Sequence, residues 1–374
     1  MDLELTDEQQ WLSESVETLL TRAWPPAEQA ADAGDAEREA LWRALVDFGA
    51  LSVERDEGLG AVELCLVARA LGAHLASVPY VGSAAVRFAA EGLLDDLPEA
   101  FADLAGGEDA VAVALLEPGR GWSVDGVATA AGDERVTGRK AAVEHVAAVD
   151  WLAVAAVADG EPALALVAPG GAGVSATEQP AFDVTVPVSA VDLSGAPAAG
   201  VASGAAGARL LERLTTVGGL LVSAEAVGAA GRLLDDAVRY AGERRQFGRT
   251  IGSNQALRHM LAHLYVRQSS MWSTVLYAAA ALDDELPEAA QTAAVAKAYV
   301  ARGAREVAHG ALQAFGGVAF TMEHPAHRFL RRIVVREQQF GDAAHHERSI
   351  GRALAAQAAG RRPDAPAATP AVTR

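Results

Sequence analysis

Apolar residues recur at helical spacing in the first part of the chain. Leu12, Val16, Leu19 and Leu20 lie three or four positions apart, so they share one face of a helix. Thr6 precedes this stretch as the expected N-cap, because its side chain can accept a hydrogen bond from the first helical turn. The same spacing predicts further helices over 40–48, 62–75 and 83–93.

The pattern changes after residue 108. Apolar residues now alternate with polar ones or form short runs, and glycine, aspartate and proline separate those runs. This pattern is typical of short strands joined by turns. Strands are expected within 110–116, 126–131, 148–157 and 163–167.

Helical spacing returns near Ala205 and continues to about Ala359. Leu210, Leu214 and Val217 form one stripe of a long helix. Long helices joined by short connections are typical of an antiparallel bundle. The bundle helices are expected over 208–243, 253–282, 287–315, 325–336 and 344–359.

Together the three patterns predict an α+β fold built from consecutive domains. An N-terminal α-helical domain is expected over 1–108, a middle antiparallel β-domain over 109–200, and a C-terminal helix bundle over 201–359. Residues 360–374 are rich in proline and alanine and offer little to bury, so this tail is expected to be disordered.

Composition and charge narrow the classes of function. Hydrophobic residues make up 51% of the 374 residues and charged residues 21%, as in a soluble globular protein. The net charge of −18 argues against non-specific binding of nucleic acid. The single cysteine, Cys65, excludes an internal disulfide framework. The N-terminus is acidic where a signal peptide is basic, and no apolar run is expected to be long and pure enough to span a bilayer, so the protein is expected to be cytoplasmic.

Three histidines are candidate metal ligands. His259 and His263 lie four positions apart on one predicted helix, and His309 lies on the next. No further ligand is spaced to join them, so no metal site is expected.

The junction between the first two bundle helices carries candidate chemistry. Residues 240–248 include Arg244, Arg245 and Phe247, and Gln255 follows shortly after. A guanidinium beside an aromatic ring at a helix junction suits a phosphate with a flat ring nearby. A helix end capped by exposed arginines is the other interpretation, and this stretch alone favours it.

Four motifs occur along the chain in a set order. They are Gly-Leu-Gly-Ala-Val-Glu-Leu at 58–64, Leu-Glu-Pro-Gly at 116–119, Glu-Arg-Arg-Gln-Phe-Gly at 243–248 with Gln255, and Gln-Ala-Phe-Gly-Gly-Val-Ala-Phe-Thr-Met-Glu-His-Pro at 313–325. With these motifs the chain resembles the acyl-CoA dehydrogenase family over nearly its whole length. The two C-terminal motifs, with the right helix between them, are the specific ones.

The resemblance implies a flavin enzyme. FAD is expected between the β-domain and the bundle, where a carboxylate removes the α-proton of an acyl-CoA thioester and hydride leaves the β-carbon for the flavin. A positioned carboxylate with a raised pKa contributes roughly two to four orders of magnitude to such a step. An electron-transferring flavoprotein then reoxidises the flavin. Members of the family are usually tetramers whose FAD sites are shared across a subunit interface.

Both positions that supply the catalytic glutamate in the family lack it here. By resemblance, Phe340 occupies the usual position, and Gly218 occupies the alternative one on the first long bundle helix. Neither residue can accept a proton. Asp342 is the nearest substitute base, although a helix N-cap is the favoured interpretation of it. Glu144 and the pair His345–His346 are further candidates.

Residues that the family places around the chain's own FAD are also changed. Ala142 and Glu144 stand where the family has a tryptophan and a threonine against the flavin. Asp342 and Ala344 stand where it has a threonine and a glutamine. The Glu-Pro-Gly motif leads into residues 120–123 (Arg-Gly-Trp-Ser), where the family has small residues and a serine.

Residues that the family lends to a neighbour's FAD are retained. Arg244 is expected to pair with pyrophosphate, and Gly317 to let the backbone approach the adenosine part closely. The chain thus keeps what it would lend and has lost much of what its own FAD would need. The predicted cofactor-binding residues are Arg244, Phe247, Gln255, Gln313, Gly316 and Gly317.

Three hypotheses follow. In the first, the chain is the base-lacking subunit of an α2β2 acyl-CoA dehydrogenase, paired with a homologous chain that carries the glutamate; a bulky or sterol-type acyl-CoA is inferred by analogy. In the second, the chain forms a self-sufficient homomeric enzyme with a relocated base. In the third, it is a non-catalytic scaffold or binding subunit without FAD.

Overall fold

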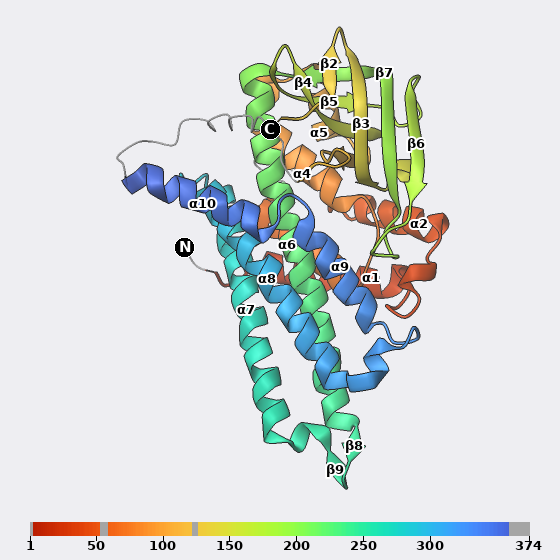
Figure 1. The fold of residues 1–374 in the computed structure, drawn as a ribbon, viewed down its shortest axis with the longest axis vertical. Helices are drawn as coiled ribbons and strands as arrows, with labels where there is room; N and C mark the ends of the chain where they lie inside the picture. The colour runs from red at the N-terminus through yellow and green to blue at the C-terminus, as the bar shows by residue number, and fades with distance from the viewer. Residues whose placement is uncertain (1–2, 53–58, 122–125, 359–374) are drawn as a thin grey trace, which may run out of the picture.

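A computed structural model describes residues 3–52, 59–121 and 126–358. The molecule is elongated, with the β-domain at one end and long helices running to the other (Figure 1). The N-terminal helices pack beside the upper half of these long helices. They are α1 (Asp7–Ala23), α2 (Asp35–Asp47), α3 (Ala61–Ala73), α4 (Tyr80–Glu91) and α5 (Glu99–Gly106).

The start of α1 forms as its sequence predicts. Thr6 Oγ1 accepts a hydrogen bond from Gln9 N at 3.2 Å, and Gln9 Oε1 accepts one from Thr6 N at 3.0 Å. These reciprocal bonds make a capping box, which satisfies two backbone donors at the helix start. Leu12, Val16 and Leu20 then turn into the core, as their spacing requires.

The β-domain is one twisted sheet of mixed direction. Most neighbouring strands pair antiparallel, as predicted, but β1 and β2 each pair parallel with β4. Alternation of side chains cannot reveal this, because it gives the face of a residue and not the direction of its neighbour. The strands are β1 (Val111–Ala114), β2 (Ala130–Gly132), β3 (Arg135–Glu144), β4 (Trp151–Ala158), β5 (Glu161–Val167), β6 (Val174–Gln179) and β7 (Val188–Ala202).

The central strand β4 separates two hydrophobic cores. Leu152 and Val154 point into the core of the β-domain itself. Ala153 and Ala155 point the other way, into the large core shared with the helices. The alternation along one strand therefore joins the β-domain to the rest of the molecule.

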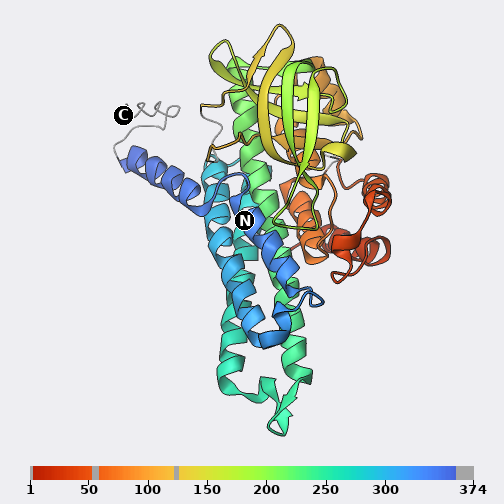
Figure 2. The same ribbon diagram turned by 45° about the vertical axis from the view of Figure 1, so that its right-hand side comes forward.

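The bundle helices lie within a few residues of their predicted positions. In both Figure 1 and Figure 2, α10 projects away from the other helices. A small hairpin, β8 (Arg245–Gln246) and β9 (Arg249–Thr250), closes the far end of the bundle. The helices are α6 (Gly204–Glu243), α7 (Gln255–Asp283), α8 (Ala289–Phe315), α9 (Ala326–Gln338) and α10 (Ala343–Ala358).

Helix α6 is the axis of the molecule, and α3 crosses it at backbone contact. A β-carbon at Gly228 would lie 1.9 Å from the Arg69 carbonyl oxygen, and one at Gly72 would lie 2.0 Å from the Glu225 carbonyl oxygen. Real atoms do not approach so closely, so each helix needs a glycine where it meets the other.

One sequence expectation fails at α6. Within the described residues, this helix holds an 18-residue window with a mean hydropathy of 1.4, which is long and apolar enough to cross a membrane by composition. The window is 89% buried inside the protein, so its apolar surface packs against other helices. The expectation that no apolar run has this length was therefore wrong, because a central core helix is hydrophobic on every side. The predicted disordered tail (360–374) and Trp122 and Ser123 lie outside the described residues.

Candidate active site

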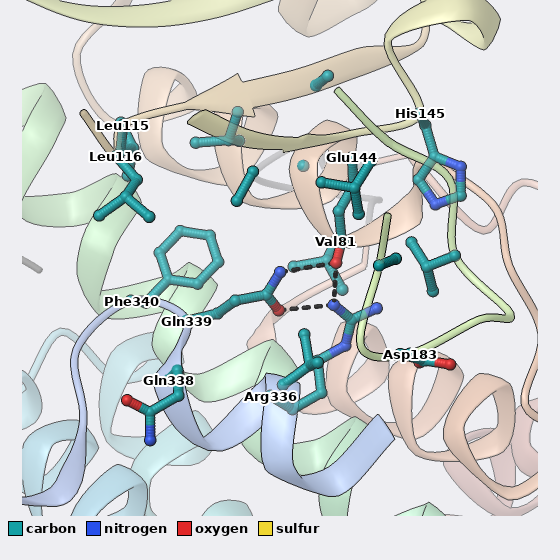
Figure 3. Close-up of a pocket in the computed structure, with 18 of the residues that line it drawn as sticks. Val81, Leu115, Leu116, Glu144, His145, Asp183, Arg336, Gln338, Gln339 and Phe340 are labelled. Carbon is teal, nitrogen blue, oxygen red and sulfur yellow. Dashed lines mark hydrogen bonds and ion pairs between the residues drawn. The ribbon is translucent and has the colours of Figure 1, made fainter. Parts of the chain in front are cut away.

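A cavity of about 900 Å³ lies where the β-domain, the N-terminal helices and the end of α9 meet. Its walls are mostly apolar, and polar side chains converge on one side of it (Figure 3). A pocket of this size and character is what a small-molecule ligand requires. Residues that line it include Val81, Leu116, Ala142, Glu144, Gln339 and Phe340.

The two positions predicted to lack the catalytic glutamate, 218 and 340, lie in contact with each other. Phe340 follows α9 in a left-handed turn (φ 54°) and is 7% exposed. Its ring lies directly over Gly218, so that a β-carbon at Gly218 would lie 2.2 Å from Phe340 Cε1. The ring therefore fills the space that any side chain at Gly218 would need. Neither position offers a proton acceptor.

Asp342 borders the cavity, but its carboxylate caps the start of α10. Its Oδ1 accepts a hydrogen bond from His345 N at 2.7 Å, where α10 begins. This is the geometry of an N-cap. The neighbouring His346 ring lies 2.9 Å from the Phe340 carbonyl oxygen, and burial lowers the pKa of His346 to about 4. His346 is therefore neutral at physiological pH.

Glu144 reaches the cavity from the end of β3 and is held on its oxygen Oε1. Arg336 Nη1 lies 2.7 Å from this oxygen, and Gln339 Nε2 donates to it at 2.7 Å (Figure 3). Arg336 Nη1 also donates to Gln339 Oε1 at 2.6 Å. Burial would lower the pKa of Arg336, but Glu144 and Glu225 raise it well above its usual value, so the guanidinium remains charged.

His145, the next residue, is buried beside this group. It is 4% exposed and adopts a left-handed backbone (φ 58°). Burial, with Arg336 and Arg38 nearby, lowers the pKa of His145 to about 3. The imidazole is therefore neutral.

Lys297 fixes the turn that carries Phe340. This buried residue of α8 donates from Nζ to the carbonyl oxygens of Arg336 at 2.6 Å and Glu337 at 3.0 Å. Burial lowers the pKa of Lys297 to about 7. Sequence reasoning missed this contact, although a lone lysine on the apolar stripe of a predicted helix was a usable signal.

The predicted cofactor-binding residues gather at the other end of the molecule. Arg244 ends α6 and leads into the hairpin that closes the bundle. The tip of that hairpin is Phe247, whose ring is 100% exposed and whose backbone is left-handed (φ 49°). Gln255 begins α7, and its Nε2 lies 2.9 Å from His259 Nε2.

The end of α8 completes this group. Gln313 is exposed on its last turn, and Gly316 ends the helix with φ 68°. A β-carbon at Gly316 or Gly317 would meet nothing within 4 Å, so this stretch of backbone is open to a ligand. Because β8, β9 and the α8 end lie far from the β-domain in Figure 1, these residues belong to a different site from the cavity.

No group of three or more His, Cys, Asp or Glu side chains that could hold a metal ion occurs in the described part of the chain. Cys65 is buried, and burial raises the pKa of its thiol well above the usual value. The thiol is therefore unreactive.

Comparison with known proteins identifies the fold. A family model described as acyl-CoA dehydrogenase, C-terminal domain, matches residues 205–355. Acyl-CoA dehydrogenase FadE27 of Mycobacterium tuberculosis is 31% identical over 336 residues, which cover 84% of this chain and 88% of that protein.

Solved structures agree with this relative. The ChsE4–ChsE5 complex from Mycobacterium tuberculosis is 30% identical, with a TM-score of 0.82 over 98% of this chain and 100% of that one. A variant of the Tcur3481–Tcur3483 steroid ACAD is 25% identical, with a TM-score of 0.82 over 94% of this chain and 99% of that one.

The fold and sequence together define an oxidoreductase of the flavoprotein class. The chain belongs to the acyl-CoA dehydrogenase family. This membership confirms the predicted α+β architecture and FAD as the cofactor of the family.

Proposed function

We propose that this chain is the base-lacking subunit of a heteromeric, α2β2 acyl-CoA dehydrogenase. With a homologous chain that carries the glutamate, it takes part in the α,β-desaturation of an acyl-CoA thioester. The observation that carries this proposal is the contact between the Phe340 ring and Gly218. Position 340 holds an apolar ring, and that ring occupies the space that a carboxylate side chain at position 218 would need.

The other titratable groups at the cavity support the proposal. A general base must be within hydrogen-bond reach of its proton and able to receive it. Glu144 is held by a permanently charged arginine and by Gln339. Asp342 caps a helix. These contacts argue against the second hypothesis, a homomeric enzyme with a relocated base.

The bundle end fits the role of lending residues to a partner's FAD. Arg244 and Gln313 are exposed there, the backbone at Gly316 and Gly317 is open, and the Phe247 ring is free to stack on a flat ligand. Arg244 would hold pyrophosphate as a charged pair. Bound FAD supplies the hydride acceptor, and this chain's residues hold and orient it. This fit argues against the third hypothesis, a scaffold without FAD.

The relatives support the partner and substrate parts of the proposal. One similar structure is the ChsE4–ChsE5 complex, and another is a steroid ACAD named for two proteins, Tcur3481 and Tcur3483. By analogy we propose a homologous subunit as partner and a bulky, sterol-type acyl-CoA as substrate. An electron-transferring flavoprotein as electron acceptor and a cytoplasmic location belong to the same proposal.

Flavin absorbance tests the proposal. The chain is purified alone and also co-expressed with a glutamate-bearing homologue, and each sample is challenged anaerobically with acyl-CoAs. We expect a colourless lone chain and a yellow complex that bleaches on addition of substrate. A lone chain that is yellow and bleaches would overturn the proposal, because a base would then reside in it.

A further inference from the structure

Five alternating charges form a chain of ion pairs beside the cavity. In order, they are Asp183, Arg332, Glu225, Arg336 and Glu144, here called the ion-pair ladder. Glu144, at the cavity, has a side chain that is 19% exposed, and the other four side chains are at most 5% exposed. A row of charges so deeply buried is stable only if each charge is paired.

The spacing of two arginines builds the ladder. Arg332 and Arg336 lie one turn apart on α9, so they face the same way. Glu225 on α6 divides its carboxylate between them: Oε1 lies 2.5 Å from Arg332 Nη1, and Oε2 lies 2.8 Å from Arg336 Nε. Each guanidinium then has donors left for a second carboxylate.

Those second partners lie in the β-domain, at both ends of the ladder. Arg332 pairs with Asp183, which precedes β7, and Arg336 pairs with Glu144 of β3 at 2.7 Å. Arg332 Nη2 donates to Thr185 Oγ1 at 2.6 Å as well. Arg332 Nη1 also donates to the Ala76 carbonyl oxygen at 3.0 Å, between α3 and α4. One face of α9 therefore ties the N-terminal helices, the β-domain and the bundle together.

The ladder ends where the family places its flavin. Glu144 stands at the position of a threonine that lies against the flavin in the family, and Ala142 stands at that of the tryptophan. Arg336 and Gln339 close on Glu144 from across the cavity (Figure 3). On this wall the side chains of Glu144, Arg336 and Gln339 hydrogen-bond to one another. The residues present therefore do not fit the polar edge of a flavin.

We propose that the ion-pair ladder holds the three parts of this chain together in place of a bound flavin, so that the chain folds fully without FAD and does not take FAD into its own cavity. The inference concerns the chain by itself. It stands or falls separately from the heteromeric function, which concerns the cofactor bound between two chains.

Calorimetry of the full chain, purified alone, tests the ladder. We expect the unfolding midpoint of the wild type to be the same with and without excess FAD. Arg336→Met leaves Glu144 and Glu225 buried without their partner, and it should lower the midpoint by roughly 5–10 °C. Arg336→Lys keeps the charge but cannot bridge two carboxylates, so it should restore only part of the loss.

Arg302→Met is the matched control. It removes a bidentate pair with Glu347, at 2.9 Å, on the exposed surface of the same bundle, and should change the midpoint by about 1 °C or less. A wild-type midpoint that FAD raises by several degrees would overturn the inference, as would an Arg336→Met variant as stable as the control. If Arg336→Met does not fold, Glu144→Gln provides the milder variant, and the FAD comparison on the wild type still decides.

Discussion

The polar side chains at the cavity are hydrogen-bonded to one another, whereas those at the far end of the bundle are exposed to solvent. At the cavity, Arg336, Gln339 and Glu144 bond to one another and leave little for a ligand. At the bundle end, Arg244 and Gln313 are exposed to solvent. A donor that folding has already used cannot also bind a cofactor without a penalty, whereas an exposed donor can.

This difference suggests how one chain of an oligomer loses the residues for its own cofactor site and retains those that it contributes to a partner's site. In an oligomer that builds each cofactor site from two chains, the residues that a chain keeps for itself and those that it lends are separate sets. On the function proposed above, Phe340 and Glu144 alter the first set, while Arg244 and Gln313 preserve the second. A chain can therefore lose its own chemistry and remain necessary to a partner.

The largest expected effect is on the cavity side. Arg332→Met removes a fully buried guanidinium that pairs with Asp183 and Glu225, and we expect a loss of about 3–5 kcal/mol in the free energy of unfolding, measured by urea titration. Arg267→Met, which breaks a partly exposed pair with Glu306, should cost less than about 1 kcal/mol. Equal losses for the two variants would erase the contrast between buried and exposed networks.

A second effect of nearly this size is pH-dependent and lies in the β-domain, at Glu117. Burial would raise the pKa of Glu117, but hydrogen bonds from Thr129, from backbone amides and from Lys140 lower it to about 2. Because this folded-state pKa is below the unfolded one, the stabilisation is complete above about pH 4.5 and is lost as the pH falls through about 2. We expect Glu117 to account for about 2–3 kcal/mol of acid destabilisation in that window.

Urea unfolding at several acidic pH values measures this slope. Glu117→Gln should flatten it, whereas Asp192→Asn, which alters an exposed pair with Arg139, should leave it unchanged. A wild-type slope that survives in Glu117→Gln would assign the acid sensitivity to other carboxylates.

The bundle end should respond in binding and not in stability. Arg244→Met removes the expected partner of the pyrophosphate, and the Kd for FAD of the co-purified complex should rise roughly 10- to 100-fold. The unfolding free energy of the lone chain should change by less than about 0.5 kcal/mol, because the side chain is exposed. Arg249→Met, on the same hairpin, is the control, and an equal loss of FAD affinity there would point to general charge and not to one contact.

The smallest effect is expected at Asp342. Asparagine caps helices as well as aspartate does, so Asp342→Asn should change stability by less than about 0.5 kcal/mol. The kcat of the complex should also be unchanged, since the carboxylate serves α10 and not the substrate. A loss of turnover of a hundredfold or more would instead make Asp342 the missing base, and the cavity would then be an active site in its own right.

Much of the fold could be predicted because the signals for helices are local. The stripe through Leu210, Leu214 and Val217 placed α6 to within a few residues, and the cap at Thr6 formed as its sequence required. The parallel pairing of β1 with β4 could not be predicted in this way, since strand direction depends on which distant segment arrives as a neighbour.

The same distinction between local and long-range information applies to the candidate site. Phe340 and Gly218 could be proposed as substitutions from the sequence, because each position can be counted from a motif; that assignment stays a prediction. Their contact could not be, nor could the pairing of Glu144 with Arg336, which lies 192 residues away along the chain. By resemblance Glu144 stands in place of a threonine, and the structure shows that its carboxylate contacts Arg336 and Gln339.

The seating of Phe340 on Gly218 has an evolutionary consequence. A GGA or GGG glycine codon becomes a glutamate codon by a single nucleotide change, so on the proposed assignment position 218 offers the shorter route to a catalytic base. The aromatic ring closes that route, because a side chain at Gly218 would collide with it. At position 340, phenylalanine and glutamate codons differ at every nucleotide. If the chain depends on a partner as proposed, the contact makes that dependence difficult to reverse.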